Sequence, residues 1–120
     1  MSGAIWNVKG YWNETLAATL DDTPAGHDFA ALLPLELTLS DYNATEKVAD
    51  LPRERDTRAA PASYTPKTGD VTYYAPWGNL AIFCKPFRTS SGLVRLGAFD
   101  GPIDALLKEG SIPVRIGAAR

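Results

Sequence analysis

Hydrophobic and polar positions alternate most regularly between Gly69 and Lys85. Side chains two residues apart lie on the same face of a β-strand, so this period of two predicts two strands. The segment between them, residues 75–78, reads Ala-Pro-Trp-Gly, with proline and glycine where a tight turn uses them. We therefore expect a hairpin near the middle of a sheet. In the first strand the alternation separates Val71 and Tyr73 from Thr72 and Tyr74. In the second strand it separates Leu80, Ile82 and Cys84 from Ala81, Phe83 and Lys85.

The same alternation recurs elsewhere and predicts further strands over residues 14–20, 35–40, 93–99 and 112–116, with a weaker candidate over 4–9. In residues 35–40 the leucines fall on one face and Glu36 and Thr38 on the other, which is typical of a half-buried antiparallel strand. A helix is predicted over residues 24–33, with Thr23 as its N-cap, Pro24 in its first position and Pro34 ending it. A second short helix is predicted over residues 102–109, with Gly110 as its C-cap.

Two segments lack a clear period. Residues 40–52, SDYNATEKVADLP, are compatible with one helical turn, capped by Asn43 with Glu46 in capping-box spacing, or with an ordered loop. Residues 53–66 are polar and contain proline and charges of both signs. They are interpreted as a long solvated loop in preference to a lid over a pocket.

The predicted elements add up to six or seven amphipathic strands and two or three short helices, without a repeated strand–helix crossover. This pattern favours a mainly all-β fold, an antiparallel sheet curled into a barrel whose ends the helices cover. A length of 120 residues has room for one domain with one core, so residues 1–120 are assigned to a single domain. Residues 1–13 are either a peripheral strand that closes the barrel or a loose arm.

Composition narrows the range of partners. The net charge of -2 argues against nucleic acid as a partner, and no apolar run approaches the roughly 18 residues that would span a membrane. The first residues, MSGAIWNVKGYW, do not resemble a signal peptide. A single cysteine makes a reducing, cytoplasmic compartment the default expectation. The oligomeric state stays open.

No residue stands out as catalytic, and we expect no metal and no cofactor. His27 is the only histidine and is interpreted as a surface or capping residue, because metal sites built on histidine need more ligands. Cys84 is interpreted as a core thiol. Asp41, Glu46 and Asp50 surround Lys47 in the sequence, and for this cluster structural hydrogen bonds are favoured over acid–base chemistry.

The best candidate for a binding site is a set of aromatic and polar residues around the hairpin. Aromatic side chains that offer a flat apolar face and a polar tip suit the recognition of a small molecule or a peptide. The alternative is that some of these residues fill the core, since aromatics favour strands regardless of function. Phe87 and Lys85 flank the set. The residues assigned to binding are Tyr42, Glu46, Tyr74, Trp77, Asn79 and Phe83.

A series of short motifs also gives a family resemblance between about residues 14 and 116. The chain resembles the small bacterial and archaeal cyclophilin-like proteins, a family of unknown function. This resemblance implies a closed antiparallel β-barrel of about eight strands with two or three short capping helices. The motifs, in order, are Leu33-Pro34-Leu35-x-Leu37, Ser40-Asp41, Glu46-Lys47, Leu51-Pro52, Gly69-Asp70-Val71-x-Tyr73-Tyr74, Trp77-x-Asn79-x-Ala81-Ile82-Phe83 and Gly92-Leu93-Val94-x-Leu96-Gly97.

The resemblance does not extend to the signature of the peptidyl-prolyl isomerases. No segment matches FHRxxxxFxxQGGD, and the strand over residues 35–40 has no arginine. Since a fold does not by itself carry an activity, a binding module is the leading hypothesis. The alternatives are a peptidyl-prolyl isomerase or another enzyme with a divergent site, in which Arg95 or Arg53 supplies the hydrogen-bond donor, and a structural or interaction domain.

Overall fold

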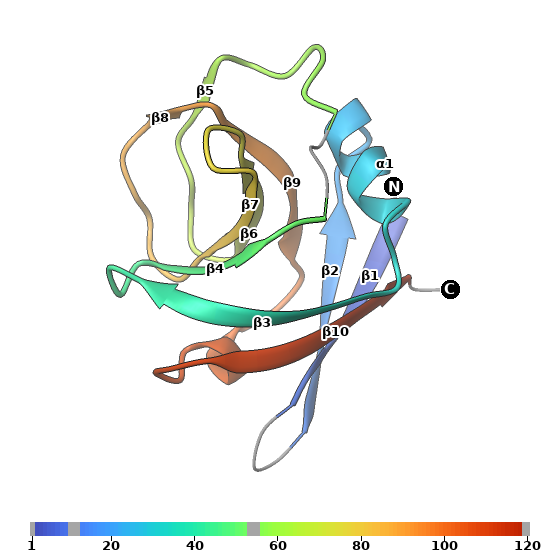
Figure 1. The fold of residues 1–120 in the computed structure, drawn as a ribbon, viewed down its shortest axis with the longest axis vertical. Helices are drawn as coiled ribbons and strands as arrows, with labels where there is room; N and C mark the ends of the chain where they lie inside the picture. The colour runs from blue at the N-terminus through green and yellow to red at the C-terminus, as the bar shows by residue number, and fades with distance from the viewer. Residues whose placement is uncertain (1, 10–12, 53–55, 119–120) are drawn as a thin grey trace.

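Eight strands close into one antiparallel barrel in the computed structural model, which describes residues 2–9, 13–52 and 56–118 (Figure 1). The order around the barrel is β1-β10-β3-β4-β7-β6-β9-β2, and every neighbouring pair is antiparallel. The closed antiparallel barrel predicted from the sequence is therefore confirmed. Its strands are β1 Ser2–Val8, β2 Glu14–Leu20, β3 Leu35–Tyr42, β4 Glu46–Asp50, β6 Asp70–Tyr74, β7 Asn79–Phe83, β9 Leu93–Phe99 and β10 Ile112–Ala118.

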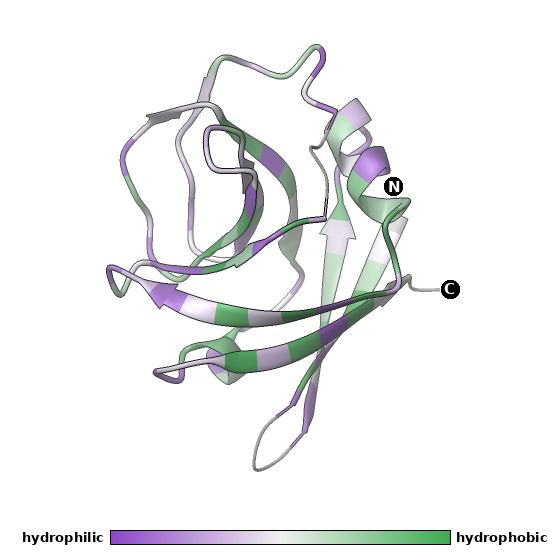
Figure 2. Ribbon diagram, in the orientation of Figure 1, coloured by the Kyte–Doolittle hydropathy of each residue, from purple (hydrophilic) through white to green (hydrophobic). Residues whose placement is uncertain are grey.

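The barrel interior is filled by the inward-facing residues of these strands. Hydropathy alternates along β3 and β10 in Figure 2, because these strands bury one face and expose the other. Ile112, Val114 and Ile116 of β10 are buried as the pattern predicts. β1 pairs with both β2 and β10, and its fully buried Trp6 meets the ring of Phe99 edge-on at a centroid distance of 5.0 Å.

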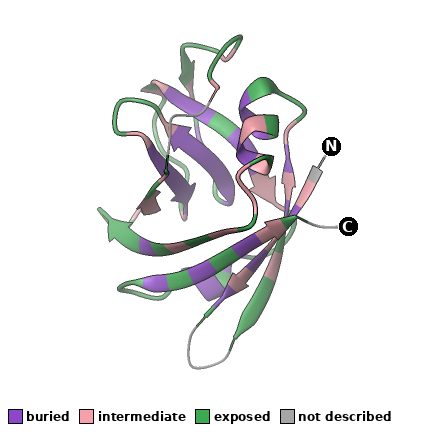
Figure 3. Ribbon diagram, turned by 45° about the vertical axis from the view of Figure 1, so that its right-hand side comes forward, coloured by how far each residue is buried: buried purple, intermediate pink, exposed green. Residues whose placement is uncertain are grey.

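β7 is buried on both faces along its whole length, and its neighbour β6 is buried on both faces up to the half-buried Tyr74 (Figure 3). Leu80 and Ile82 point into the barrel core, as the sequence pattern assigns them. The opposite face belongs to a second, smaller cluster, in which Ala81 and Phe83 meet Leu93 of β9. Part of its cover is a two-stranded sheet of β5 Ser63–Tyr64 and β8 Ser90–Ser91, which is separate from the barrel sheet. This layer positions the candidate site on the outer face of the barrel.

The helix α1 spans Pro24–Ala30 and begins as predicted. The Thr23 side chain accepts a hydrogen bond from the backbone N–H of Gly26 at 3.0 Å, and Pro24 occupies the first turn. α1 ends at Ala30, earlier than the predicted Leu33, and residues 31–33 continue as a turn. Phe29 is fully buried and anchors the helix on the core.

The predicted helix over residues 102–109 is wrong. The segment 102–109 contains only the 3-10 turn η1, Asp104–Leu106, because its N-cap residue Ile103 offers no side-chain hydrogen bond and so short a helix is unstable. Where the sequence left a helical turn and an ordered loop open, residues 43–45 form the tight turn of a β3–β4 hairpin. Asn43 and Ala44 take positive φ values of 52° and 56°, as the two central residues of a type I′ turn do, and the Thr45 N–H donates to the Tyr42 carbonyl at 3.1 Å.

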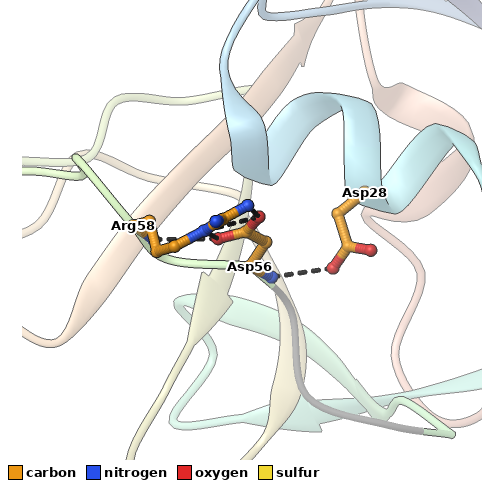
Figure 4. Close-up of polar contacts among 3 residues, drawn as sticks. All are labelled: Asp28, Asp56 and Arg58. Atoms are coloured by element: carbon orange, nitrogen blue, oxygen red, sulfur yellow. Dashed lines mark hydrogen bonds and ion pairs between the residues drawn. The ribbon is translucent and has the colours of Figure 1, made fainter.

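The described part of the 53–66 loop begins against α1 at Asp56 and continues to β5 (Figure 4). The backbone N–H of Asp56 donates to Asp28 Oδ2 on the helix at 2.7 Å. The Arg58 guanidinium donates two hydrogen bonds to the Asp56 carboxylate, from Nε to Oδ1 at 2.9 Å and from Nη2 to Oδ2 at 2.6 Å. Since the Arg58 guanidinium hydrogen-bonds that carboxylate, the pKa of Asp56 falls to about 2.

Candidate aromatic binding site

The six residues assigned to binding from the sequence line one cavity of about 210 Å³ on the outer face of the barrel. This aromatic cavity lies over strands β4, β6 and β7. Its volume is below the roughly 300–1,000 Å³ of pockets for drug-sized ligands, so it suits a small head group or a single side chain. Its walls are completed by Asn43, Val48, Phe87, Arg88, Ser90 and Leu93.

Strand register brings the six residues together. Glu46 of β4 lies between Tyr42 of β3 and Phe83 of β7, its cross-strand neighbours. Asn79 and Tyr74 are neighbours across the β6–β7 pair. Residues two apart share a face, so these side chains point outward together.

Small apolar residues occupy the outer face of β4 and β7 at the cavity. Val48 of β4 lines the cavity, and Ala81 of β7 lies opposite Val48 in the register. Both belong to the outer hydrophobic cluster. Short side chains here leave room that a larger residue would occupy, which produces the hollow.

The β6–β7 turn supplies the most exposed aromatic side chain of the site. Trp77 is 57% exposed, and its ring meets the rings of Tyr42 and Tyr74 at centroid distances of 5.4 Å each. The interplanar angles are 81° and 79°, so both contacts are edge-to-face. Gly78 at φ 65° allows the turn to close behind Trp77. The three rings form one continuous aromatic wall.

The segment after β7 adds a second wall. Phe87 stacks on Phe83 at a centroid distance of 6.2 Å, and the Arg88 guanidinium lies 5.1 Å from the centre of the Phe87 ring. Backbone hydrogen bonds from Cys84 to Thr45 and from Phe87 to residue 66 hold this segment on the barrel. Arg88 was not among the residues singled out from the sequence, where it reads as one more exposed charge in a polar connection.

Two residues that line the cavity have an acceptor group without a partner among the described residues. Asn79 is only 7% exposed, and its Oδ1 is buried and receives no hydrogen bond from that part of the chain. Glu46 forms no ion pair and no side-chain hydrogen bond with any residue that the structure describes, and burial raises the pKa of its carboxyl group. A buried polar group without a partner is costly, which distinguishes this site from ordinary surface.

In the charged cluster around Lys47, Asp41 makes the structural hydrogen bonds that the favoured interpretation expects, whereas Glu46 lines the aromatic cavity. Lys47 is 2% exposed, and its Nζ donates to Asp41 Oδ1 and to the backbone carbonyl of Lys108. The second Asp41 oxygen accepts from the Gly110 N–H at 2.7 Å, and the hydrogen bond from Lys47 lowers the pKa of Asp41. This cluster ties the β3–β4 hairpin to the 108–110 loop.

Two expectations for individual side chains need correction. Cys84 follows β7 and is half-buried beside a second cavity; it is not a core thiol, and burial raises the pKa of its thiol group. Lys85 is exposed and lines that second cavity, not the aromatic one. His27 lies at the surface as expected, with Nε2 2.5 Å from Asp22 Oδ1.

Of the two arginines considered as hydrogen-bond donors, Arg95 does not line the aromatic cavity. Arg95 Nε lies 3.3 Å from Asp21 Oδ2, and both residues line a different cavity between the start of α1 and the 58–61 loop. Arg53 lies outside the described residues. Beside Arg95, the hydroxyl of Tyr64 donates to Asp70 Oδ2 at 2.6 Å, and burial with this bond raises the pKa of Tyr64 to about 12.

Within residues 2–9, 13–52 and 56–118, no group of three or more potential metal ligands is found. In the same part of the chain, no helix has the length and apolar character needed to cross a membrane.

Comparison with known proteins places the fold. The solution structure of a hypothetical protein from Archaeoglobus fulgidus superimposes with a TM-score of 0.70 and 16% sequence identity, over 98% of this chain and 95% of that one. At this identity the similarity concerns the fold alone. A search of curated protein sequences finds no significant match. A sequence model of the cyclophilin-like family matches residues 11–117, and the chain therefore belongs to the cyclophilin-like family.

Proposed function

We propose that this protein is a binding module that recognises a small molecule or a peptide side chain in the aromatic cavity. The observation that supports it is the convergence of three aromatic side chains and two unpartnered acceptors on one hollow of about 210 Å³. A purely structural role explains the buried Phe83 but not an edge-to-face aromatic wall at the surface. The single thiol, Cys84, supports a reducing, cytoplasmic location.

A fragment screen by NMR tests this proposal. The ¹⁵N-labelled protein is titrated with a library of small amines, amides, acids and proline peptides, and the backbone and indole N–H signals are followed. Binders are expected to shift Trp77 and its neighbours in the aromatic cavity. A screen in which no compound shifts these signals contradicts the proposal.

A matched pair of variants gives the control. Trp77→Ala removes one exposed aromatic wall and is expected to weaken binding at least about tenfold. Leu107→Ala removes a side chain of similar exposure, 51% against 57%, outside the aromatic cavity and is expected to leave binding unchanged. Equal effects from both variants count against the cavity as the site.

Arg88 favours a second candidate, a peptidyl-prolyl isomerase. Prolyl isomerisation needs an apolar cradle and a hydrogen bond to the prolyl nitrogen, and Arg88 is the arginine that lines the aromatic cavity among the described residues. A protease-coupled or NMR exchange assay on X-Pro peptides tests it. A rate above background that falls in Arg88→Ala supports the activity, and a rate equal to background removes it.

A further inference from the structure

The polar groups of the aromatic cavity are biased toward acceptors. Asn79 Oδ1 is buried and receives no hydrogen bond, and the Glu46 carboxylate has no ion pair or side-chain hydrogen bond within the described residues. An occupant that donates hydrogen bonds or carries positive charge would compensate both groups, because each loses water without gaining a partner.

The aromatic wall also favours a positively charged occupant. The faces of indole and phenol rings carry negative electrostatic potential and attract cations, most strongly where water is excluded. In the wall, the Trp77 ring lies between the rings of Tyr42 and Tyr74. The Trp77 ring plane is nearly perpendicular to each of the other two ring planes. Rings at such angles present both faces and edges to a small group, an arrangement that suits an ammonium carrying apolar substituents.

Among the described residues, Arg88 is the one positively charged side chain that lines the cavity, and its guanidinium contacts an aromatic ring. The Arg88 guanidinium lies over Phe87 and makes no ion pair with Glu46 in the described part of the chain. The Glu46 charge is therefore not neutralised from within the site. Burial without a counter-ion raises the pKa of Glu46, in agreement with this arrangement.

We propose that the aromatic cavity takes an organic cation, an ammonium head group with methyl or alkyl substituents, between Glu46 and the Tyr42–Trp77–Tyr74 wall. The inference rests on the proposed binding function and adds the charge of the ligand. The Glu46 carboxylate supplies the counter-charge, the buried Asn79 Oδ1 adds negative potential next to the cavity, and Val48 in the lining limits the size of the head group.

The test compares choline with 3,3-dimethyl-1-butanol, its neutral isostere of nearly equal shape. Dissociation constants are measured by NMR titration of the full chain, with the Trp77 indole N–H as the reporter. Choline is expected to bind at least about tenfold more tightly than the alcohol. Glu46→Gln keeps the shape of the side chain and is expected to remove most of this preference.

A matched control separates the local charge from the overall charge. Glu36→Gln removes an exposed carboxylate of β3 outside the cavity and is expected to leave the preference unchanged. Equal affinity for choline and the alcohol overturns the cation inference and leaves the binding function standing. If other compounds from the fragment screen bind at Trp77 but choline does not, the cation inference is likewise overturned and the binding function stands. If no compound of either experiment binds at Trp77, both proposals fail.

Discussion

Asn79 gives the sharpest test of whether the cavity is built for an absent partner. Its Oδ1 is buried without a hydrogen bond, and an unsatisfied buried polar group costs about 1–3 kcal/mol. Asn79→Leu replaces the amide by an apolar group of similar shape while keeping the backbone pairing with Tyr74. The free energy of unfolding should therefore rise by about 1–3 kcal/mol.

The assay is urea denaturation followed by circular dichroism, with the m-value checked for constancy. With m near 2 kcal/mol per molar urea, a gain of about 2 kcal/mol moves the midpoint up by about 1 M. The gain should come at the expense of ligand affinity, because the substitution removes the acceptor. The structure therefore predicts that Asn79→Leu has a higher free energy of unfolding and a lower ligand affinity than the wild-type protein.

Thr72→Val is the matched control. The Thr72 hydroxyl is also buried beside the cavity, but it donates to the carbonyl of Ala81 at 2.7 Å. Removing a satisfied hydrogen bond should lower stability by about 0.5–1.5 kcal/mol. If Asn79→Leu lowers stability as Thr72→Val does, the Asn79 oxygen has a partner in the free protein and the reasoning fails.

Three further predictions follow from the scaffold. Lys47→Ala should lower the free energy of unfolding by about 2–4 kcal/mol in urea denaturation, because a buried side chain and its hydrogen bonds are lost. The control Lys85→Ala, at an exposed position, should change it by no more than about 0.5 kcal/mol. Equal effects of the two substitutions would contradict the structural role of Lys47. The raised pKa of Glu46 means that the folded state holds this proton to higher pH than the unfolded chain, so stability should decline as pH rises above the ordinary value of 4.5 and through the folded pKa. Glu46→Gln should flatten that decline in urea midpoints taken from about pH 4 to about pH 8, and an unchanged slope would refute it. Gly97→Ala should destabilise the barrel by about 1–3 kcal/mol in thermal melts, because its new Cβ would lie 2.3 Å from the Thr19 carbonyl oxygen of β2; a wild-type melting temperature would contradict this close approach.

The strands that sequence reasoning found are those whose inward positions are apolar. β6 and β7 alternate cleanly because Val71, Leu80 and Ile82 fill the core. β4 was not predicted, because Lys47 occupies an inward position. Its ammonium donates a hydrogen bond there to Asp41, the neighbouring residue on β3. A charged residue facing inward inverts the pattern on which strand prediction depends.

The candidate site was predictable in its aromatic residues and not in its polar details. The sequence identifies Tyr74 and Trp77 as candidates for binding because they lie at a turn, where large rings are seldom needed for packing. The unpaired oxygen of Asn79 depends on strand register, and the place of Arg88 depends on how residues 84–92 fold over β7. Neither leaves a signal in local sequence, because both arise from contacts between distant segments.

The most direct test of the account is to locate a bound cation by intermolecular NOEs. With choline at saturating concentration, the trimethylammonium protons should show NOEs to ring protons of Tyr42, Tyr74 and Trp77, which lie within 5.4 Å of one another in successive pairs. NOEs confined to residues of the other cavities, or none from these rings while choline is bound, would contradict the central claim that this aromatic wall is the binding site.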